Sequence, residues 1–176
     1  KNNTVYGGKT VILFKYSREA NGGGYNSLIE DNIIMHNTVE AFAEEGISFD
    51  VVGNDSNQVA SLEYDKISSA SGSKVTLAHA NWAPAGNPSY VGYDMIFLSG
   101  TLAGQLRRII AQESATFTLD ADITGAANGD EIVIGATFKR NIIRYNTVIS
   151  DHRSSILFFG MGFYNIIEHN TLTAGS

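Results

Sequence analysis

An eight-residue arrangement of polar and hydrophobic positions occurs three times in the chain. The copies lie at 32–39, 141–148 and 165–172 and read NIIMHNTV, NIIRYNTV and NIIEHNTL, so that six of the eight positions are the same or nearly so. Ile, Val and Thr favour pleated strands, whereas Asn tolerates the left-handed bends found at corners. The arrangement therefore predicts short β-strands joined at asparagine-containing corners.

The spacing of the copies predicts how these strands are organised. The second and third copies start 24 residues apart, which is typical of one coil of stacked parallel strands with about three short strands per coil. The first and second copies start 109 residues apart, which is 85 more than one such period. We therefore expect coils over 1–54 and 140–176, interrupted by an inserted domain over 55–139.

Segments outside the eight-residue repeat extend the predicted stack. Segments 12–16, 47–51 and 156–160 each carry apolar residues or Gly at alternate positions, as a strand with one buried face does. Stacking them predicts inward ladders Ile12–Ile47–Ile156 and Phe14–Phe49–Phe158, an outward ladder Lys15–Asp50–Phe159, and an inner asparagine ladder Asn37–Asn146–Asn170. A helix over 26–45 is the competing interpretation, and the repeat outweighs it because it relates this segment to two others with β character.

The repeated Asn-Ile-Ile-x-x-Asn-Thr-Val units resemble coils of the right-handed parallel β-helix (pectate-lyase-like) superfamily. This superfamily includes polysaccharide lyases, glycoside hydrolases, epimerases, phage tailspikes and adhesins. The resemblance covers the two flanks of the chain and implies an all-β fold, a right-handed parallel β-helix. It also implies an extracellular location, either secreted or on a virion surface, and a polysaccharide partner.

The insert over 55–139 differs in composition and contains both prolines, Pro84 and Pro88, and the only tryptophan, Trp82. It also repeats itself, since 67–77 resembles 110–119 and each is followed by an Asp-bearing turn and a strand, at 93–100 and 129–135. Two such halves predict a small β-barrel or sandwich with pseudo-twofold symmetry.

Composition removes several classes of function. Twelve basic against 18 acidic residues give a net charge of −6, and no basic run exceeds a pair, so we expect no nucleic-acid partner. No apolar stretch approaches the ~18 residues of a spanning helix, so we expect no membrane insertion. Without Cys there is no disulfide or thiolate metal site. We predict no metal and no cofactor, although Ca²⁺ would be compatible with an acidic glycan.

Charged residues on the predicted outer surface supply the candidate chemistry. A glycosidase needs two carboxylates about 5–5.5 Å or about 6.5–9.5 Å apart, and Asp50 with Glu45 or Asp151 would supply them. A lyase needs a base such as His152 and a cation such as Arg153 or Lys15 to neutralise the enolate. The predicted catalytic residues are Asp50, Asp151, His152 and Arg153. The predicted substrate-binding residues are Lys15, Glu44, Glu45, Phe159 and Trp82.

Several of these residues also have structural interpretations. The opposite charges of Glu44 and Arg153 at equivalent corner positions predict an ion pair between coils. His36, Tyr145 and His169 share one repeat position, which predicts a packing ladder rather than a metal site. Four aromatic residues are predicted to be exposed and able to stack on sugar rings, or else to pack: Trp82, Tyr90, Tyr93 and Phe159.

These observations favour a carbohydrate-binding or polysaccharide-degrading protein, a lyase or glycoside hydrolase acting on an extended acidic glycan. The alternatives are a non-catalytic structural module, as in a phage tail fibre or adhesin, and a sugar epimerase that uses the same proton-abstracting groups. The predicted coils leave strand edges unpaired at both ends. We therefore expect either continuation in a longer chain or a homotrimer.

Overall fold

The computed structural model describes residues 2–7, 10–15, 29–50, 63–79, 90–135, 137–151 and 153–174. In these ranges the chain is all-β and forms no helix, so the competing helix interpretation is wrong for 29–45. The described residues also contain no helix that could cross a membrane. Contacts divide the chain into two compact units: a coil unit, described over 2–7, 10–15, 29–50, 137–151 and 153–174, and a barrel unit, described over 63–79 and 90–135.

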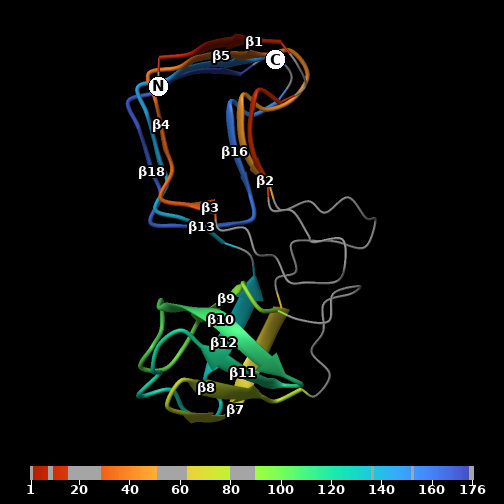
Figure 1. Ribbon diagram of the computed structural model, residues 1–176, viewed down its shortest axis with the longest axis vertical. Coiled ribbons are helices and arrows are strands. Elements are labelled where there is room, and N and C mark those ends of the chain that lie inside the picture. The colour runs from red at the N-terminus through yellow and green to blue at the C-terminus, as the bar shows by residue number, and fades with distance from the viewer. Residues whose placement is uncertain are drawn as a thin grey trace. The chain divides into compact units, whose positions relative to one another are not determined.

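The coil unit consists of four parallel sheets, each forming one side of a four-sided coil (Figure 1). One sheet contains β1 (Thr4–Tyr6), β5 (Thr38–Ala41), β15 (Thr147–Ser150) and β19 (Thr171–Ala174). A second contains β2 (Ile12–Lys15), β6 (Ile47–Asp50) and β16 (Ile156–Phe159). A third contains β3 (Ile29–Glu30), β13 (Thr137–Lys139) and β17 (Met161–Phe163). The fourth contains β4 (Ile33–Met35), β14 (Ile142–Arg144) and β18 (Ile166–Glu168).

The sequence analysis expected about three strands per coil, and the structure has four. The reason lies in the eight-residue repeat, which holds two strands rather than one, separated by a bend. His36, Tyr145 and His169 form this bend with φ values of 57°, 55° and 51°. The left-handed residue is therefore the one before the asparagine, whereas we had assigned this conformation to the asparagines themselves.

The asparagines instead point inward and hydrogen-bond from coil to coil. Asn37 and Asn146 are 5% and 1% exposed, and the amide nitrogen of each donates to the side-chain oxygen of the asparagine in the next coil at 3.0 Å. The predicted ladder Asn37–Asn146–Asn170 is confirmed, and Asn3 extends it by one coil. The structure adds a second ladder, Asn32–Asn141–Asn165, which the sequence analysis did not predict.

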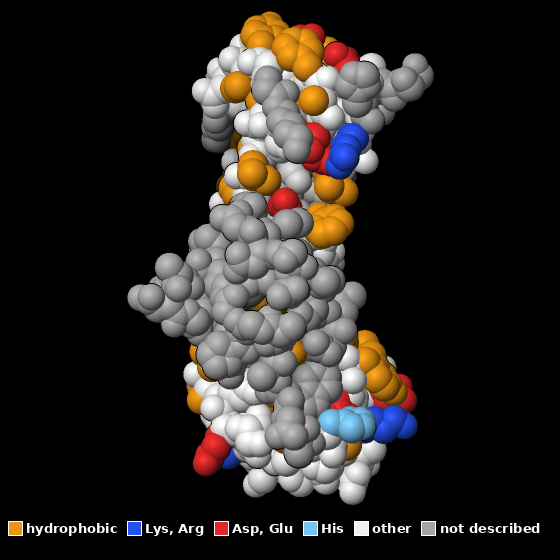
Figure 2. All heavy atoms as spheres, turned by 90° about the vertical axis from the view of Figure 1, so that its right-hand side faces the viewer, with side chains coloured by type: hydrophobic (Ala, Val, Ile, Leu, Met, Phe, Trp, Pro, Cys, Tyr) orange, Lys and Arg blue, Asp and Glu red, His pale blue; other side chains and the backbone are white. Residues whose placement is uncertain are grey.

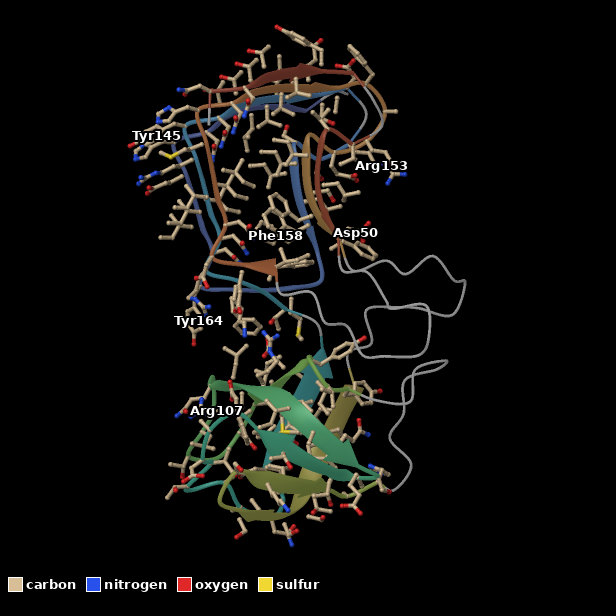
Figure 3. The ribbon with its side chains drawn as sticks, viewed as in Figure 1. Asp50, Arg107, Tyr145, Arg153, Phe158 and Tyr164 are labelled. Atoms are coloured by element: carbon tan, nitrogen blue, oxygen red, sulfur yellow. The ribbon has the colours of Figure 1, made fainter. Side chains whose placement is uncertain are left out.

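Register confirms the predicted inward and outward ladders of the second sheet. Phe49 lies opposite Phe14 and Phe158, with stacked rings whose centroids are 4.8 and 4.4 Å apart. Ile47 lies opposite Ile12 and Ile156, and Asp50 lies opposite Lys15 and Phe159. The side chain of Phe158 points into the interior enclosed by the four sides (Figure 3). Alternate apolar residues thus form one continuous core through the stack.

The insertion is shorter at its C-terminal end than we expected. β13 was predicted to belong to the insert, but its Phe138 pairs with Ile29 of β3 and Gly162 of β17 in parallel register. Phe138 is fully buried, and its ring lies edge-on to Phe49 at 5.6 Å. Burial in the coil core therefore makes 137–139 part of a coil.

The barrel unit is a closed six-stranded barrel with the order β10–β11–β8–β7–β12–β9. Its strands are β7 (Glu63–Ser71), β8 (Lys74–Leu77), β9 (Asp94–Phe97), β10 (Leu106–Glu113), β11 (Thr116–Leu119) and β12 (Glu131–Gly135). All of its strand pairs are antiparallel.

The barrel has the predicted pseudo-twofold symmetry. Ile67 pairs with Leu77 and Ile109 with Leu119, and each pair is followed by a register shift. The counterpart of Ile67 is therefore Ile109, not Ile110 as the sequence comparison suggested, and Ile110 is 54% exposed. Both hairpins have the register shift at the same place, so Ile110 follows Ile109 as Ser68 follows Ile67 and is the extra residue of its bulge.

Candidate functional site

Among the described residues, the predicted catalytic Asp50 belongs to a different part of the coil from Asp151 and Arg153. Asp50 is the last residue of β6, whereas Asp151 and Arg153 lie in the corner that precedes the same sheet. A four-residue strand separates its ends by about 10 Å. Figure 3 shows Asp50 at one end of this side of the coil and Arg153 at the other. The predicted pairing of Asp50 with Asp151 therefore gains no support, and His152 lies outside the described residues.

The predicted corner residues do lie together, but they bond the coils to each other. Arg153 Nη1 lies 3.6 Å from Oε1 of Glu45, whose side chain is 8% exposed. The Glu44 carboxylate accepts a 3.2 Å hydrogen bond from the Thr10 hydroxyl. Arg153 therefore contacts Glu45, which is the residue next to Glu44, the ion-pair partner predicted from the sequence. Figure 2, viewed toward β2 and β16, shows acidic and basic side chains in contact on the coil unit.

The predicted substrate-binding aromatics have different environments. Phe159 is 50% exposed and is the last residue of β16, whose other three residues are half-buried. Tyr90 and Tyr93 are 1% and 3% exposed, and their rings pack edge-to-face at 5.5 Å. The expectation that these two tyrosines are exposed is therefore wrong, because they fill the barrel unit's core. Trp82 lies outside the described residues, and Lys15 is described only as a strand residue opposite Asp50.

A different surface combines repeated polar, aromatic and apolar groups on three successive coils. We call it the ladder face, and it comprises the outer side of β4, β14 and β18 with the corner at each end. Its central stripe contains Ile33, Ile142 and Ile166, which lie opposite one another in register. Its corners contain His36, Tyr145 and His169 on one side and Asp31, Arg140 and Tyr164 on the other. Figure 3 shows Tyr145 and Tyr164 on this side of the coil.

The first corner of the ladder face is a stack of three rings. The rings of His36 and Tyr145 are 5.3 Å apart and within 7° of parallel, and those of Tyr145 and His169 are 5.1 Å apart and within 6°. This confirms the predicted packing ladder. The Arg144 guanidinium lies 5.7 Å from the centre of the Tyr145 ring. Stacking covers the ring faces, so each coil presents a polar ring edge, an imidazole or a phenol, to the outside.

The second corner of the ladder face contains a charged pair beside an open aromatic ring. Arg140 donates two hydrogen bonds to Asp31, at 2.8 and 2.7 Å, and a third to Glu30 at 3.0 Å. These contacts hold the pKa of Asp31 below its usual value and raise the pKa of Arg140. Tyr164 occupies the same corner one coil further and is 65% exposed. This corner therefore offers one aromatic ring and a pair of nearly neutralised charges.

The centre of the ladder face contains an apolar stripe. Ile33 and Ile166 are 57% and 47% exposed, whereas Ile34 and Ile143, which follow the first two isoleucines of the stripe, are buried. Neighbouring strands in a sheet lie about 4.8 Å apart, so the stripe repeats at that interval along the stack. The surface can thus contact the apolar side of an elongated molecule and hydrogen-bond to it from both margins.

The barrel unit contains a histidine–aspartate pair that the sequence analysis missed. His79 Nδ1 lies 2.6 Å from Oδ1 of Asp65, whose side chain is fully buried, while the His79 side chain is 78% exposed. Figure 2 shows a histidine beside a basic side chain on the barrel. The only signal in the sequence was the position of the two residues. Asp65 lies two residues before Ile67, His79 lies two residues after Leu77, and Ile67 pairs with Leu77 in one hairpin. Charge and spacing by themselves do not distinguish them from other surface residues.

Asp65 makes the barrel's stability depend on pH. Burial opposes its ionisation, but hydrogen bonds from the Lys66 amide and from His79 outweigh burial and lower its pKa below 3.8. A carboxyl with a lowered folded-state pKa stabilises the fold above the unfolded-state pKa, and this contribution is lost as the pH falls through the folded-state pKa.

We therefore predict that Asp65→Asn makes the barrel less stable at neutral pH and flattens its loss of stability below pH 3.8. Hydrogen exchange or thermal unfolding at about pH 7 and about pH 3 measures the difference. His79→Ala should show a smaller loss at neutral pH, because the Lys66 amide still donates to the carboxylate. An unchanged acid profile in Asp65→Asn would show that other carboxyls determine the acid response.

Metal binding finds no support among the residues that the structure describes, since no three His, Asp or Glu side chains are grouped to hold an ion.

No protein-family model and no curated protein matches the chain. Among solved structures, it matches the Gp54 tailspike of Acinetobacter baumannii bacteriophage AP22, which was solved in complex with A. baumannii capsular saccharide. The match has 12% identity and a TM-score of 0.24, and it covers 88% of this chain and 28% of the tailspike chain. A likeness this weak assigns neither a fold nor a function, so the chain is placed in no family.

Proposed function

We propose that the coil unit is a segment of a right-handed parallel β-helix and that the barrel unit is a domain inserted between β6 and β13. Four parallel sheets, in-register coils and inward asparagine ladders support this proposal. So does the pairing of β5 with β15, which are neighbours although 109 residues separate Thr38 from Thr147.

We propose further that the ladder face binds an extended glycan outside the cell, on a secreted protein or a virion surface. The observation that supports this proposal is the in-register stack of His36, Tyr145 and His169 beside the isoleucine stripe of the ladder face. Polar ring edges recur once per coil and suit the hydroxyl groups of a repeating polymer. The aliphatic stripe suits the C–H-rich faces of its sugar rings. An elongated ligand would therefore lie across the strands, along the stack.

The proposed activity is binding rather than cleavage. The acidic side chains of the ladder face have basic partners: Asp31 contacts Arg140, and Glu168 lies 3.7 Å from Arg144. A general acid must release a proton near neutral pH, whereas the contact with Arg140 lowers the pKa of Asp31. The hydrolysis considered from the sequence paired Asp50 with Glu45 or Asp151, and these residues belong to opposite ends of β6 and its preceding corner. The elimination considered from the sequence used His152, which lies outside the described residues.

Substitution of Tyr145 tests the glycan proposal. We expect Tyr145→Ala to weaken binding about tenfold, because it removes a hydrogen-bonding edge and separates the two imidazoles that stack on it. Tyr6→Ala is the matched control, since Tyr6 is an exposed tyrosine of β1, outside the ladder face. Binding is measured by calorimetry against a panel of neutral and acidic bacterial surface polysaccharides, first with the unaltered protein.

Two results would contradict the proposal. If the unaltered protein binds no polysaccharide of the panel, the non-catalytic structural interpretation becomes the better one. If it binds one and Tyr145→Ala and Tyr6→Ala bind equally well, the site lies elsewhere. Reducing-sugar and ultraviolet assays on the same samples detect hydrolysis and elimination, and product in either assay would overturn binding without cleavage.

A further inference from the structure

The stacked rings of the ladder face alternate between two chemical types. From coil to coil, the corner holds the imidazole of His36, the phenol of Tyr145 and the imidazole of His169, with neighbouring ring centres 5.3 and 5.1 Å apart. All three residues are exposed. In the coil on the other side of His36, the same corner is occupied by Asn2, which is uncharged. The two imidazoles therefore lie about 10 Å apart, twice the strand spacing, with a phenol between them.

The other charges beside these rings balance one another. Arg144 and Glu168 are in register on β14 and β18, with Arg144 Nη1 3.7 Å from the Glu168 carboxylate. The aligned residue of β4 is the uncharged Met35. At the opposite corner of the ladder face, two basic and two acidic residues contact one another: Lys139, Arg140, Glu30 and Asp31.

The two imidazoles make the charge of the ladder face depend on pH. Carboxylates, lysine and arginine ordinarily keep their charges between about pH 5 and about pH 8, whereas histidine gains a proton as the pH falls through this interval. Among the described residues of the ladder face, only His36 and His169 are of this type. The face is therefore nearly neutral above this interval and carries two additional positive charges below it, both at the ring corner.

We propose that the glycan of the ladder face carries an acidic sugar at every second position, and that His36 and His169 bind two successive acidic sugars more tightly as the pH falls. This inference rests on the proposed glycan binding. An extended chain of β-linked pyranose rings advances by about one strand spacing per sugar, so consecutive sugars lie against consecutive coils. Acidic groups on alternate sugars then meet the two imidazoles, and the uncharged sugar between them meets the phenol of Tyr145.

The strength of the two imidazole contacts sets the size of the pH effect. A protonated imidazole donates from both ring nitrogens and forms a charge-assisted hydrogen bond with a carboxylate, which is stronger than a neutral one. Both contacts belong to one polymer chain, so they act together. Because the contacts are exposed, we expect the two together to tighten binding about tenfold between about pH 7.5 and about pH 5.5. Added salt should reduce this gain by screening the charges.

Two forms of one polymer test the inference. Hyaluronan alternates a uronic acid with an uncharged N-acetylated amino sugar, and carboxyl-reduced hyaluronan of the same length lacks the negative charges. Calorimetry with the unaltered full chain measures the affinity for each at about pH 7.5 and about pH 5.5. Hyaluronan should bind about tenfold more tightly at the lower pH, and the affinity of the reduced form should not change with pH.

Substitutions at the ring corner test the two-point contact. Glutamine keeps hydrogen-bonding groups but gains no proton, so His36→Gln or His169→Gln should each lower the gain with hyaluronan to about threefold, and the double variant should abolish it. Tyr145→His places a third imidazole against the uncharged sugar and should leave the gain near tenfold. His79→Gln is the matched control, because His79 is an exposed histidine of the barrel unit, and it should retain the full gain. Circular dichroism verifies that every variant is folded.

The outcomes separate this inference from glycan binding itself. Hyaluronan that binds no more tightly at the lower pH, or no more tightly than its reduced form there, overturns the inference, while binding of either form leaves the proposed function intact. A full gain in the double glutamine variant places the pH response outside the ladder face and also overturns the inference. So does a gain that rises well above tenfold in Tyr145→His, because charge would then act regardless of position. If neither form of hyaluronan nor any polysaccharide of the panel binds, the proposed function fails as well.

Discussion

Asn146→Ala is expected to destabilise the coil unit by about 3–4 kcal/mol, because it breaks the asparagine ladder at its most buried point. The Asn146 side-chain oxygen accepts the backbone and side-chain amides of Asn37, and its amide donates to the carbonyls of Ile34 and Arg144. Alanine removes these bonds together. Each buried polar group left without a partner costs about 1–3 kcal/mol, and partial relaxation of the corner recovers some of this.

The measurement must report on the coil unit alone. Hydrogen exchange of the Val148 amide follows the coils, and that of the Val75 amide in the barrel is an internal reference that should not change. Thr147→Ala is the matched control, since Thr147 is the exposed neighbour of Asn146 and its loss should change stability by less than about 1 kcal/mol. Equal effects of the two substitutions would mean that the ladder adds little beyond the strand pairing.

Phe49→Ala is expected to destabilise the coil unit by about 3–5 kcal/mol. Phe49 is fully buried, stacks on Phe14 and Phe158, and meets the ring of Phe138 edge-on at 5.6 Å. Its removal leaves a cavity between two rings that main-chain pairing on both sides holds apart, so the surroundings can collapse only partly. The loss therefore exceeds the simple transfer free energy of the side chain.

Urea unfolding monitored by the same coil amides measures this effect. Phe159→Ala provides the comparison, because Phe159 belongs to the neighbouring coil and is half exposed, and its loss should be below about 1 kcal/mol. Phe49→Leu should fall between the two, since it keeps most of the buried volume. A loss below about 1 kcal/mol in Phe49→Ala would mean that the coils can close over the missing ring.

Much of the coil unit is predictable because its contacts repeat in the sequence. Parallel stacking places equivalent residues of successive coils opposite each other, so that comparing the copies already identifies Phe14, Phe49 and Phe158 as one ladder. The same comparison identifies Asn37 with Asn146 and the ring stack at Tyr145. A match between copies constrains pairing more strongly than the helix propensity of a single segment.

Other features could not be predicted because they depend on a single residue's backbone conformation. The left-handed bend occurs at His36 rather than at Asn37, since the inward asparagine side chain needs the preceding residue to turn the chain. In the barrel, the buried counterpart of Ile67 is Ile109, and Ile110 is the extra residue of a bulge. Secondary-structure propensities and hydrophobic periodicity do not detect a shift of one residue. Such a shift nevertheless exchanges the buried and exposed faces of a strand.

The sequence by itself determined which strands of the coil unit lie opposite one another and which ladders fill its core, because equivalent residues of a regular repeat stack in register. The tertiary structure decided where exposed groups meet. It placed Asp50 and Arg153 at opposite ends of one sheet side, gathered the ladder face around Tyr145, and joined Asp65 to His79. Side chains at the corners of the coils and across the barrel meet because of the way the backbone folds in three dimensions. The pattern of residues along the sequence does not specify that course of the backbone.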